Sequence, residues 1–385
     1  MLRIISMLVC LAVLSGCATK SDIASSLPPV DSGVITIGAV LPLSGDYSIF
    51  GRQIKDGLDL KIAEANAGAA KKLRLVTVDN QSTAAGSLEG FRALVKKYHP
   101  PVIIGAYTST NTMAMKYEAM QLETTLITPT ATNDLITERN PYVFRSCFCD
   151  SRQGSALGKF AYESGLKRIG VMLDVDEDGM YSKMLGRSVG EAFENAGGKV
   201  VIEEGYYSAE ADFSRQLESI KKRKVDAILL PGYPDDVIRM ILNGRGIGFT
   251  KVFFGGDGWN NAALPRLLKR QLVGCFFSTM YAPDYPAPQV KKFISAYTAA
   301  YKVDPDMPAA QGYDTAGIVV AALGGGDADA NTFRKNLYTI KNYPGVTGNI
   351  SFDAQGNAVK PVFIREFVPD DKDGVLLKLK KIMTP

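Results

Sequence analysis

The chain has 385 residues, of which 46% are hydrophobic and 22% charged, and its net charge is +4. This length fits two domains better than one, and the composition is that of an ordinary globular protein. The basic run 221–224 is short and comes directly before a predicted strand, so it is interpreted as a solvated helix end. The charge pattern therefore argues against nucleic acid as a partner.

The N-terminus has the form of a secretory signal. One basic residue, Arg3, precedes an apolar run over 4–14, which is shorter than the roughly 20 residues that span a bilayer. The run ends in Leu14-Ser15-Gly16-Cys17, which resembles the lipobox of bacterial lipoproteins. The resemblance implies that 1–16 are a lipoprotein signal peptide and that Cys17 is lipidated. Residues 17–33 are then a flexible lipidated tether that holds the protein on the extracytoplasmic side of the cell envelope, in the periplasm or at the cell surface.

Short β-rich runs alternate with amphipathic helical patterns along the rest of the chain. Strands are predicted at 34–41, 73–78, 102–105, 126–128, 168–173, 199–204, 227–230, 252–255 and 273–278. Helices are predicted at 53–66, 88–97, 113–122, 182–195, 213–222 and 235–243. Because the strands are almost continuously apolar, the pattern predicts parallel sheets covered on both faces, in two doubly wound α/β domains.

A cluster of hydroxyl groups follows the predicted strand 102–105. Residues 107–112 include Ser109 and three threonines, lack Lys and Arg, and lead into a predicted helix. Backbone N–H groups at a helix start, together with nearby hydroxyls, favour an anion as small as a carboxylate. The alternative is that Ser109 only caps the helix.

Further polar residues also come directly after predicted strands. Thr130, Tyr233 and Asp257 share this position with Ser109. In doubly wound sheets, ligands bind outside the carboxyl ends of the strands. These residues are therefore candidates for one binding site.

Several motifs, taken in order, resemble those of type I periplasmic solute-binding proteins, and most closely the leucine/isoleucine/valine-binding receptors of ABC transporters. The matching stretches are 37–45 with Gly51, Ile127-Thr128-Pro129-Thr130-Ala131-Thr132, Phe144-Arg145, Asp150 with Gln153-Gly154, Pro231-Gly232-Tyr233, 255–259 and Gly312-Tyr313-Asp314. The resemblance implies two Rossmann-like lobes joined by a three-strand hinge that closes around a ligand. The N-terminal lobe would be 34–145 plus 278–358, and the C-terminal lobe 146–277 plus 359–385.

The resemblance also implies roles for the strand-end residues. Ser109 and Thr132 would bind the α-carboxylate of an amino acid, and the carbonyl of Thr130 would accept from its ammonium group. Asp257 would pair with the ammonium, although the branched-chain binders compared have Glu there. Without the resemblance, an Asp in a Gly-Gly-Asp-Gly sequence is a turn former.

Aromatic residues align at or near the side-chain end of the same cleft. A pocket lined by them favours an apolar, branched-chain or aromatic side chain, with simple amides or urea as the uncharged alternative. Trp259 could instead pack beneath its loop. The aromatic candidates are Phe50, Tyr107, Tyr181, Tyr233, Tyr313 and Trp259.

Other kinds of site find little support in the sequence. Residues 174–179 fit half of a calcium loop, but Leu185 stands where the loop needs Glu, and a strand rather than a helix precedes it. The single histidine, His99, adjoins no other catalytic candidate, and nucleophile and phosphate-loop motifs are absent. We expect no metal, no cofactor and no enzymatic activity.

The family fold leaves two possibilities open for the remaining cysteines. Either Cys147 or Cys149 forms a disulfide with Cys275, or all three are buried thiols.

The sequence therefore predicts a lipid-anchored, monomeric receptor that captures a small amino acid and delivers it to an ABC permease. The alternative is a lipoprotein of the same fold that activates a cell-wall enzyme or a sensor without binding a small ligand. Ala18 after Cys17 is compatible with outer-membrane sorting and favours that alternative, whereas Ser109, Thr132, Tyr233 and Asp257 favour ligand binding.

Overall fold

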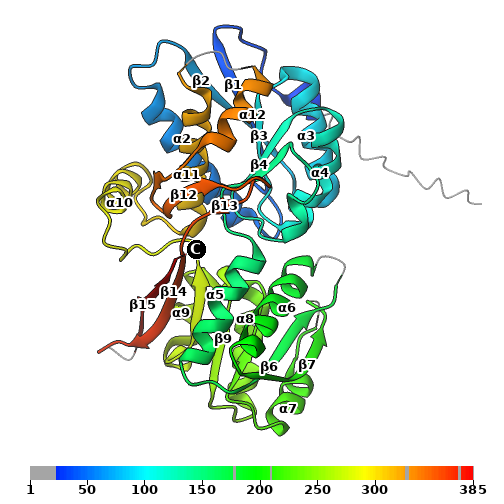
Figure 1. The fold of residues 1–385 in the computed structure, drawn as a ribbon, viewed down its shortest axis with the longest axis vertical. Helices are drawn as coiled ribbons and strands as arrows, with labels where there is room; N and C mark the ends of the chain where they lie inside the picture. The colour runs from blue at the N-terminus through cyan, green and yellow to red at the C-terminus, as the bar shows by residue number, and fades with distance from the viewer. Residues whose placement is uncertain (1–22, 177–178, 209, 326–328, 372–373, 385) are drawn as a thin grey trace, which may run out of the picture.

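The computed structural model describes residues 23–384 except 177–178, 209, 326–328 and 372–373. Two lobes lie one above the other along the long axis of the molecule, with the connections between them gathered at one side (Figure 1). Each lobe is built around its own sheet, as the strand–helix alternation predicted.

The upper lobe in Figure 1 contains a parallel five-stranded sheet in the order β2-β1-β3-β4-β5. Its strands are β1 (Val34–Leu41), β2 (Lys72–Asp79), β3 (Val102–Gly105), β4 (Thr125–Thr128) and β5 (Val143–Arg145). The helices of this lobe are α2 (Ser48–Asn66), α3 (Ala84–Tyr98), α4 (Ser109–Gln121), α10 (Pro288–Tyr301), α11 (Met307–Leu323) and α12 (Ala330–Thr339). A small sheet adds β11 (Tyr343–Gly345), β12 (Gly348–Phe352) and β13 (Ala358–Val359).

The lower lobe repeats the same strand order, β7-β6-β8-β9-β10, and extends it with two antiparallel strands, β14 and β15. Its strands are β6 (Arg168–Asp174), β7 (Lys199–Tyr206), β8 (Ala227–Leu229), β9 (Val252–Gly255), β10 (Phe276–Thr279), β14 (Val362–Pro369) and β15 (Val375–Met383). Its helices are α5 (Asp150–Glu163), α6 (Met180–Asn195), α7 (Ser214–Lys222), α8 (Pro234–Gly246) and α9 (Ala263–Leu268). Two 3₁₀ turns, η2 (Asp257–Trp259) and η3 (Lys269–Leu272), complete it.

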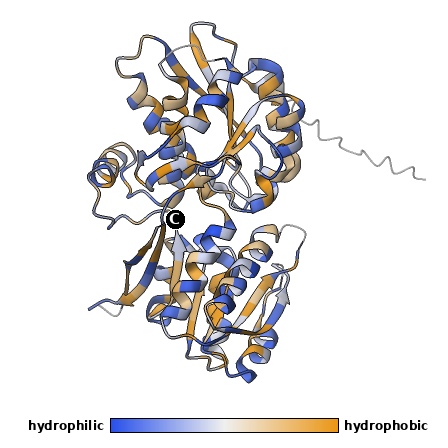
Figure 2. Ribbon diagram, viewed as in Figure 1, coloured by the Kyte–Doolittle hydropathy of each residue, from blue (hydrophilic) through white to orange (hydrophobic). Residues whose placement is uncertain are grey.

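Helices cover both faces of the upper sheet, which explains why its strands are apolar throughout. In β1, Ile37 and Leu41 belong to the core that contains Ile54 and Leu58 of α2, whereas Val40 belongs to the core under α3. Successive residues of a strand point to opposite faces, so burial on both sides requires an unbroken apolar run. Figure 2 shows such hydrophobic strands inside both lobes.

The chain passes between the two sheets three times. It leaves the upper sheet after β5, leaves the lower sheet after β10, and returns from β13 to β14. The lobe boundary predicted between 277 and 278 falls inside β10, whose four residues all belong to the lower sheet. The crossing therefore begins after Thr279.

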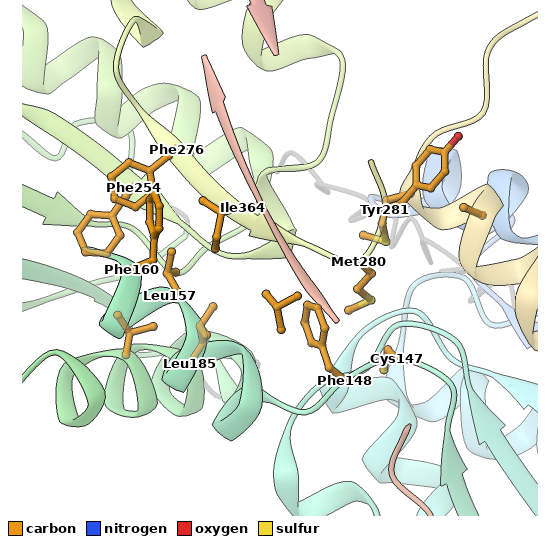
Figure 3. Packing of buried hydrophobic residues seen from close by; sticks show 14 of the residues in the cluster. Cys147, Phe148, Leu157, Phe160, Leu185, Phe254, Phe276, Met280, Tyr281 and Ile364 are labelled. Carbon is orange, nitrogen blue, oxygen red and sulfur yellow. The ribbon is translucent and has the colours of Figure 1, made fainter. Parts of the chain in front are cut away.

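Apolar side chains from all three crossings pack into one cluster, part of which Figure 3 shows. Cys147 and Phe148 follow β5, Met280 and Tyr281 follow β10, and Ile364 lies in β14. These residues are at most 2% exposed. The crossings thus pack against one another as part of the core.

Several predicted elements start at different residues in the structure. The helices predicted at 53–66 and 88–97 begin earlier, at Ser48 and Ala84. The helix predicted at 113–122 begins at Ser109, because Thr108 is its N-cap and its side chain accepts from the N–H of Asn111. The strand predicted to begin at Val273 begins at Phe276. The hydroxyl cluster after β3 is therefore the first turn of α4 rather than a loop before it.

The predicted tether is only partly separate from the folded lobe. Cys17 and the signal sequence lie outside the described residues. From Ile23 onward the chain forms α1 (Ile23–Ser26) and packs on α3, where Leu27 is 7% exposed. Lys97 Nζ donates to the Leu27 carbonyl at 2.6 Å. The prediction of a flexible tether up to residue 33 is corrected for this segment.

The three remaining cysteines are free, buried thiols. Cys147 packs in the cluster of the crossings, whereas Cys275 precedes β10 in a core with Trp259 and Phe277. Since β10 runs from Cys275 toward the crossings, the strand separates the two thiols. The disulfide considered from the family fold is not formed.

Candidate functional site

The ends of strands from both lobes meet around one small cavity. Ser109 and Thr130 follow β3 and β4 of the upper lobe, and Asp257 follows β9 of the lower lobe. The cavity has a volume of only about 10 Å³, the space of about one water molecule, against the roughly 300–1,000 Å³ of sites for drug-sized ligands, so the groups around it must move apart to admit one. Its lining residues are Tyr107, Ser109, Thr130, Ala131, Thr132, Tyr181, Tyr233, Asp257, Gly258 and Met307.

The start of α4 forms one wall of the cavity. Thr108 caps this helix, so Ser109 is its first residue and its hydroxyl is not needed as the cap. Ser109 Oγ accepts from the backbone N–H of Asn133 at 3.3 Å, and the residue is 2% exposed. The positive end of the helix dipole and this hydroxyl therefore both adjoin the cavity, which suits a small anion.

The loop that carries Thr130 and Thr132 is held from behind by Arg145. This guanidinium is fully buried and donates to the carbonyls of four consecutive residues and to one hydroxyl. The acceptors are the carbonyls of Ala131 (3.3 Å), Thr132 (2.6 Å), Asn133 (2.8 Å) and Asp134 (3.3 Å), and Thr137 Oγ1 (3.2 Å). The planar fork of an arginine can bind several acceptors at once, so one side chain fixes the loop.

Thr130 and Thr132 differ in how their own polar groups are used. The Thr130 hydroxyl donates to the carbonyl of Tyr107 at 2.8 Å, which joins the loops after β3 and β4. The Thr132 carbonyl accepts from the backbone N–H of Asp150 at 2.8 Å. Both threonines line the cavity and are at most 5% exposed.

Asp257 supplies the carboxylate of the cavity. Its Oδ1 accepts from Gln153 Nε2 and from the Tyr181 hydroxyl, each at 2.9 Å. The same hydroxyl accepts from the N–H of Gly258 at 3.1 Å, which fixes the direction of its proton. Burial raises the pKa of Asp257 to about 6, against the effect of these hydrogen bonds. The carboxylate is thus charged at neutral pH but is poorly solvated, so a bound cation would stabilise it.

A second carboxyl group lies close to Asp257 but does not line the cavity. Asp150, the first residue of α5, is fully buried. Burial, and then the charge of Asp257, raise the pKa of Asp150 well above its usual range. Two close buried carboxylates do not ionise together readily, so Asp257 is the one that is charged first.

Three tyrosine rings also line the cavity. Tyr107 comes from the upper lobe and Tyr181 and Tyr233 from the lower, with ring centroids of Tyr181 and Tyr233 5.3 Å apart. Phe50 lies one layer back and stacks on Tyr107 at 4.8 Å. Burial keeps the pKa of Tyr107 and Tyr233 well above the usual tyrosine range, so both phenols stay neutral.

Besides Phe50, two more predicted site residues do not line this cavity. Trp259 is 1% exposed in the core of the lower lobe, and its indole N–H donates to the Leu230 carbonyl at 2.9 Å. A side chain at Gly255 would lie 2.0 Å from that indole nitrogen, so the missing Cβ creates the space for the ring. Tyr313 lies between α11 and α2, where its hydroxyl donates to Glu64 at 2.7 Å.

Some residues of the site carried no individual prediction. Met307 lines the cavity from the start of α11, and Arg145 and Gln153 position the loop and the carboxylate. Arg145 and Gln153 stood in the sequence motifs, but only the fold shows what they contact. Met307 had no signal in the sequence.

The two lobes touch across the cavity. The side chain of Asn133, after β4, donates to the Met180 carbonyl at the start of α6 at 3.0 Å. The rings of Tyr107 and Tyr233 also approach each other, with centroids 6.2 Å apart. The structure is therefore a closed form in which both lobes contribute to one site.

The part of the chain that the structure describes contains no group of three or more His, Cys, Asp or Glu side chains placed to hold a metal ion. The calcium-loop sequence falls partly on 177–178, which are outside that part. No helix among the described residues is long and apolar enough to cross a membrane.

Comparisons with known proteins agree with this geometry. Residues 34–373 match the family described as periplasmic binding protein. The chain is 24% identical over 356 residues to the Leu/Ile/Val-binding protein BraC3 of Rhizobium johnstonii, covering 90% of this chain and 95% of that protein.

Two solved structures are also similar. The leucine-binding protein LivK of Thermotoga maritima has a TM-score of 0.84 and 28% identity, over 91% of this chain and 99% of its own. The branched-chain amino acid transporter substrate-binding protein LivJ of Streptococcus pneumoniae, solved with isoleucine, has a TM-score of 0.80 and 27% identity, over 90% and 99%. With the shared fold and the interlobe cavity, the chain belongs to the periplasmic binding protein family, as a solute-binding protein of the ABC transporter type and not an enzyme.

Proposed function

We propose that this protein captures a small amino acid, with leucine, isoleucine or valine favoured, between its two lobes and delivers it to an ABC permease. The observation that carries the proposal is the division of charge across the cavity. The upper lobe offers hydroxyls and a helix N-terminus, and the lower lobe offers the Asp257 carboxylate. No Lys or Arg is among the described residues that line the cavity. A zwitterion matches this arrangement, since each of its charges meets the opposite polarity.

The ligand would lie with its α-carboxylate toward Ser109 and Thr132 and its ammonium toward Asp257 and the carbonyl of Thr130. Charge-assisted hydrogen bonds of this kind contribute about 1.5–3 kcal/mol each where water is excluded. Tyr181 holds Asp257 in place for this contact. Closing of the lobes completes the cage, and the permease would recognise the closed form.

The side chain of the ligand would face the apolar part of the cavity. Tyr107, Tyr233 and Met307 provide this surface. It suits an aliphatic group better than a second carboxylate. The names of the similar proteins, which bind leucine, isoleucine and valine, favour the same class. An uncharged amide would leave the buried Asp257 without a cation.

A thermal-shift screen of the twenty amino acids and simple amides tests this function. The protein is first unfolded and refolded, so that no ligand is carried through purification. At 100 times Kd, a ligand should add about 2.7 kcal/mol to the free energy of unfolding. We expect leucine, isoleucine and valine to raise the melting temperature. A shift with amides alone would contradict the contact between Asp257 and an ammonium group. If no compound shifts the melting temperature of refolded protein, the alternative is favoured, in which a lipoprotein of this fold activates a cell-wall enzyme or a sensor without binding a small ligand.

We also propose that Cys17 carries the lipid anchor, on the strength of its lipobox-like sequence. A Cys17→Ser variant is expected to leave the membrane fraction and appear in the soluble extract, because the signal alone does not provide stable anchoring. The measurement is fractionation of cells that express either form, with Cys275→Ser, a buried thiol, as the control. Equal membrane retention of the Cys17→Ser variant would rule out this anchor.

A further inference from the structure

A layer of three rings closes the side-chain end of the cavity. The ring centroid of Tyr47 lies 5.6 Å from that of Tyr107 and 5.3 Å from that of Tyr233. Tyr107 and Tyr233 line the inner cavity, but Tyr47 does not. We call Tyr47, Tyr107 and Tyr233 the ring triad. Its rings come from both lobes, so it forms only when the lobes are closed.

A second, open cavity lies on the other side of the ring triad. Its volume is about 740 Å³, and Tyr47 and Tyr233 both line it. Tyr233 therefore separates the two cavities directly, with one face of the residue accessible from each. Tyr47 packs against the ring of Tyr233 on the side of the outer cavity.

The outer cavity is acidic. Among the described residues that line it, Arg239 is the one basic side chain, and it is bound to Asp236 and to the carbonyls of Ser208 and Glu210. A positive group that reached past the ring triad would enter a negative field, whereas a carboxylate would be repelled. The acidic lining residues are Asp46, Asp174, Asp176, Asp235 and Asp236.

We propose that Tyr47 is a specificity-determining residue that limits the length of the ligand side chain by packing on the outer side of Tyr107 and Tyr233 and holding these rings between the inner and the outer cavity. The inference rests on the proposed function, since it needs an amino acid in the inner cavity with its side chain toward the ring triad. Without the ring of Tyr47, Tyr233 alone stands between the two cavities and loses its packing partner, so long side chains can displace it and reach the outer cavity. Those that end in a cation gain most, because of the aspartates beyond.

The backbone of Tyr47 is anchored independently of its ring. Its N–H donates to Ser82 Oγ at 3.1 Å, and its carbonyl accepts from the N–H groups of Phe50 and Gly51, both at 3.1 Å. The start of α2 is therefore held by contacts that a substitution of the ring leaves in place. Loss of the ring changes the cavity without removing the helix start.

The test compares ligand profiles of three proteins by isothermal titration calorimetry. They are the wild type, Tyr47→Ala and Tyr47→Phe, which keeps the ring and loses the hydroxyl. Leucine, norleucine, lysine and glutamate serve as probes, since norleucine and lysine have chains of similar length but different charge. Tyr117→Ala is the control, because Tyr117 is 64% exposed on α4 and away from both cavities.

We expect Tyr47→Ala to bind lysine at least about tenfold more tightly than the wild type does, which corresponds to about 1.4 kcal/mol. Norleucine should gain less and glutamate should not gain. Tyr47→Phe and Tyr117→Ala should keep the wild-type profile. If Tyr47→Ala does not fold, as judged by its melting curve, Tyr47→Val takes its place with the same expectations.

Two outcomes separate failure of this inference from failure of the proposed function. If the wild type binds leucine but Tyr47→Ala gains neither lysine nor norleucine, or if the wild type already binds lysine as tightly as leucine, Tyr47 does not limit length and the inference is wrong. If the refolded wild type binds none of the amino acids, the proposed function itself fails.

Discussion

Replacing Asp257 with asparagine is expected to weaken binding of the favoured amino acid by about 30- to 4,000-fold, or about 2–5 kcal/mol. Asparagine keeps the shape of the side chain but removes the charge that would pair with the ammonium group. The loss is large because Asp257 is 7% exposed, so water cannot replace the missing partner. Isothermal titration calorimetry at pH 7.5 measures the effect, with Asp235→Asn as a control of the same chemistry on the outer cavity.

The pH dependence of binding is a second test of the pairing between Asp257 and the ammonium group. Because the pKa of Asp257 is raised to about 6, ligand affinity should fall as the pH drops below 6, by up to about tenfold per unit. The stability of the ligand-free protein should respond to this group in the opposite direction. The folded state binds the proton more tightly than the unfolded state, so the contribution of Asp257 to stability is full below about pH 4 and is lost as the pH rises through 6.

Asp257→Asn should flatten both pH responses relative to the wild type, because the titrating group is gone. Affinity within a factor of about three of the wild type, with an unchanged pH profile, would show that the ammonium group does not pair with Asp257. The Asp235→Asn control should bind as the wild type does.

Replacing Arg145 with methionine is expected to lower the free energy of unfolding by roughly 3–5 kcal/mol, which for a protein of this size lowers the melting temperature by about 4–7 °C. The substitution removes five hydrogen bonds donated by one buried cation, and bonds from a charged donor contribute about 1.5–3 kcal/mol each. The net loss is smaller than their sum, because the carbonyls of Ala131, Thr132 and Asn133 each keep a second donor.

Arg145→Lys should be destabilised nearly as much, because an ammonium group lacks the planar fork that reaches several carbonyls. Arg152→Met is the matched control, since Arg152 makes a partly exposed ion pair with Asp353 at 3.8 Å, a kind of contact worth about 0–1 kcal/mol. Thermal melts of the three variants give the comparison. A melting temperature for Arg145→Met within about 2 °C of the wild type would show that the loop after β4 does not depend on this side chain.

The N-terminal segment shows why composition alone misjudged the tether. Residues 18–31 are polar and small enough to look flexible, and nothing in them predicts a partner. In the fold, Leu27 packs on the apolar surface of α3, and Lys97 Nζ donates to the Leu27 carbonyl. That surface exists only once α3 has packed on the sheet.

The sequence by itself determined the fold class and the positions of the main polar groups of the site. Apolar strands alternating with amphipathic helices require parallel sheets, and parallel strands bring Ser109 and Thr130 to one edge of the upper sheet and Asp257 to the corresponding edge of the lower sheet, because carboxyl ends within a sheet point the same way. Only the tertiary structure decided which aromatic rings face the cavity. Trp259, two residues from Asp257, turns into the core because Gly255 leaves room for its indole, whereas Tyr47 reaches Tyr233 across the lobes. The direction in which each ring points depends on contacts between segments far apart in the chain, and no local sequence pattern encodes these contacts.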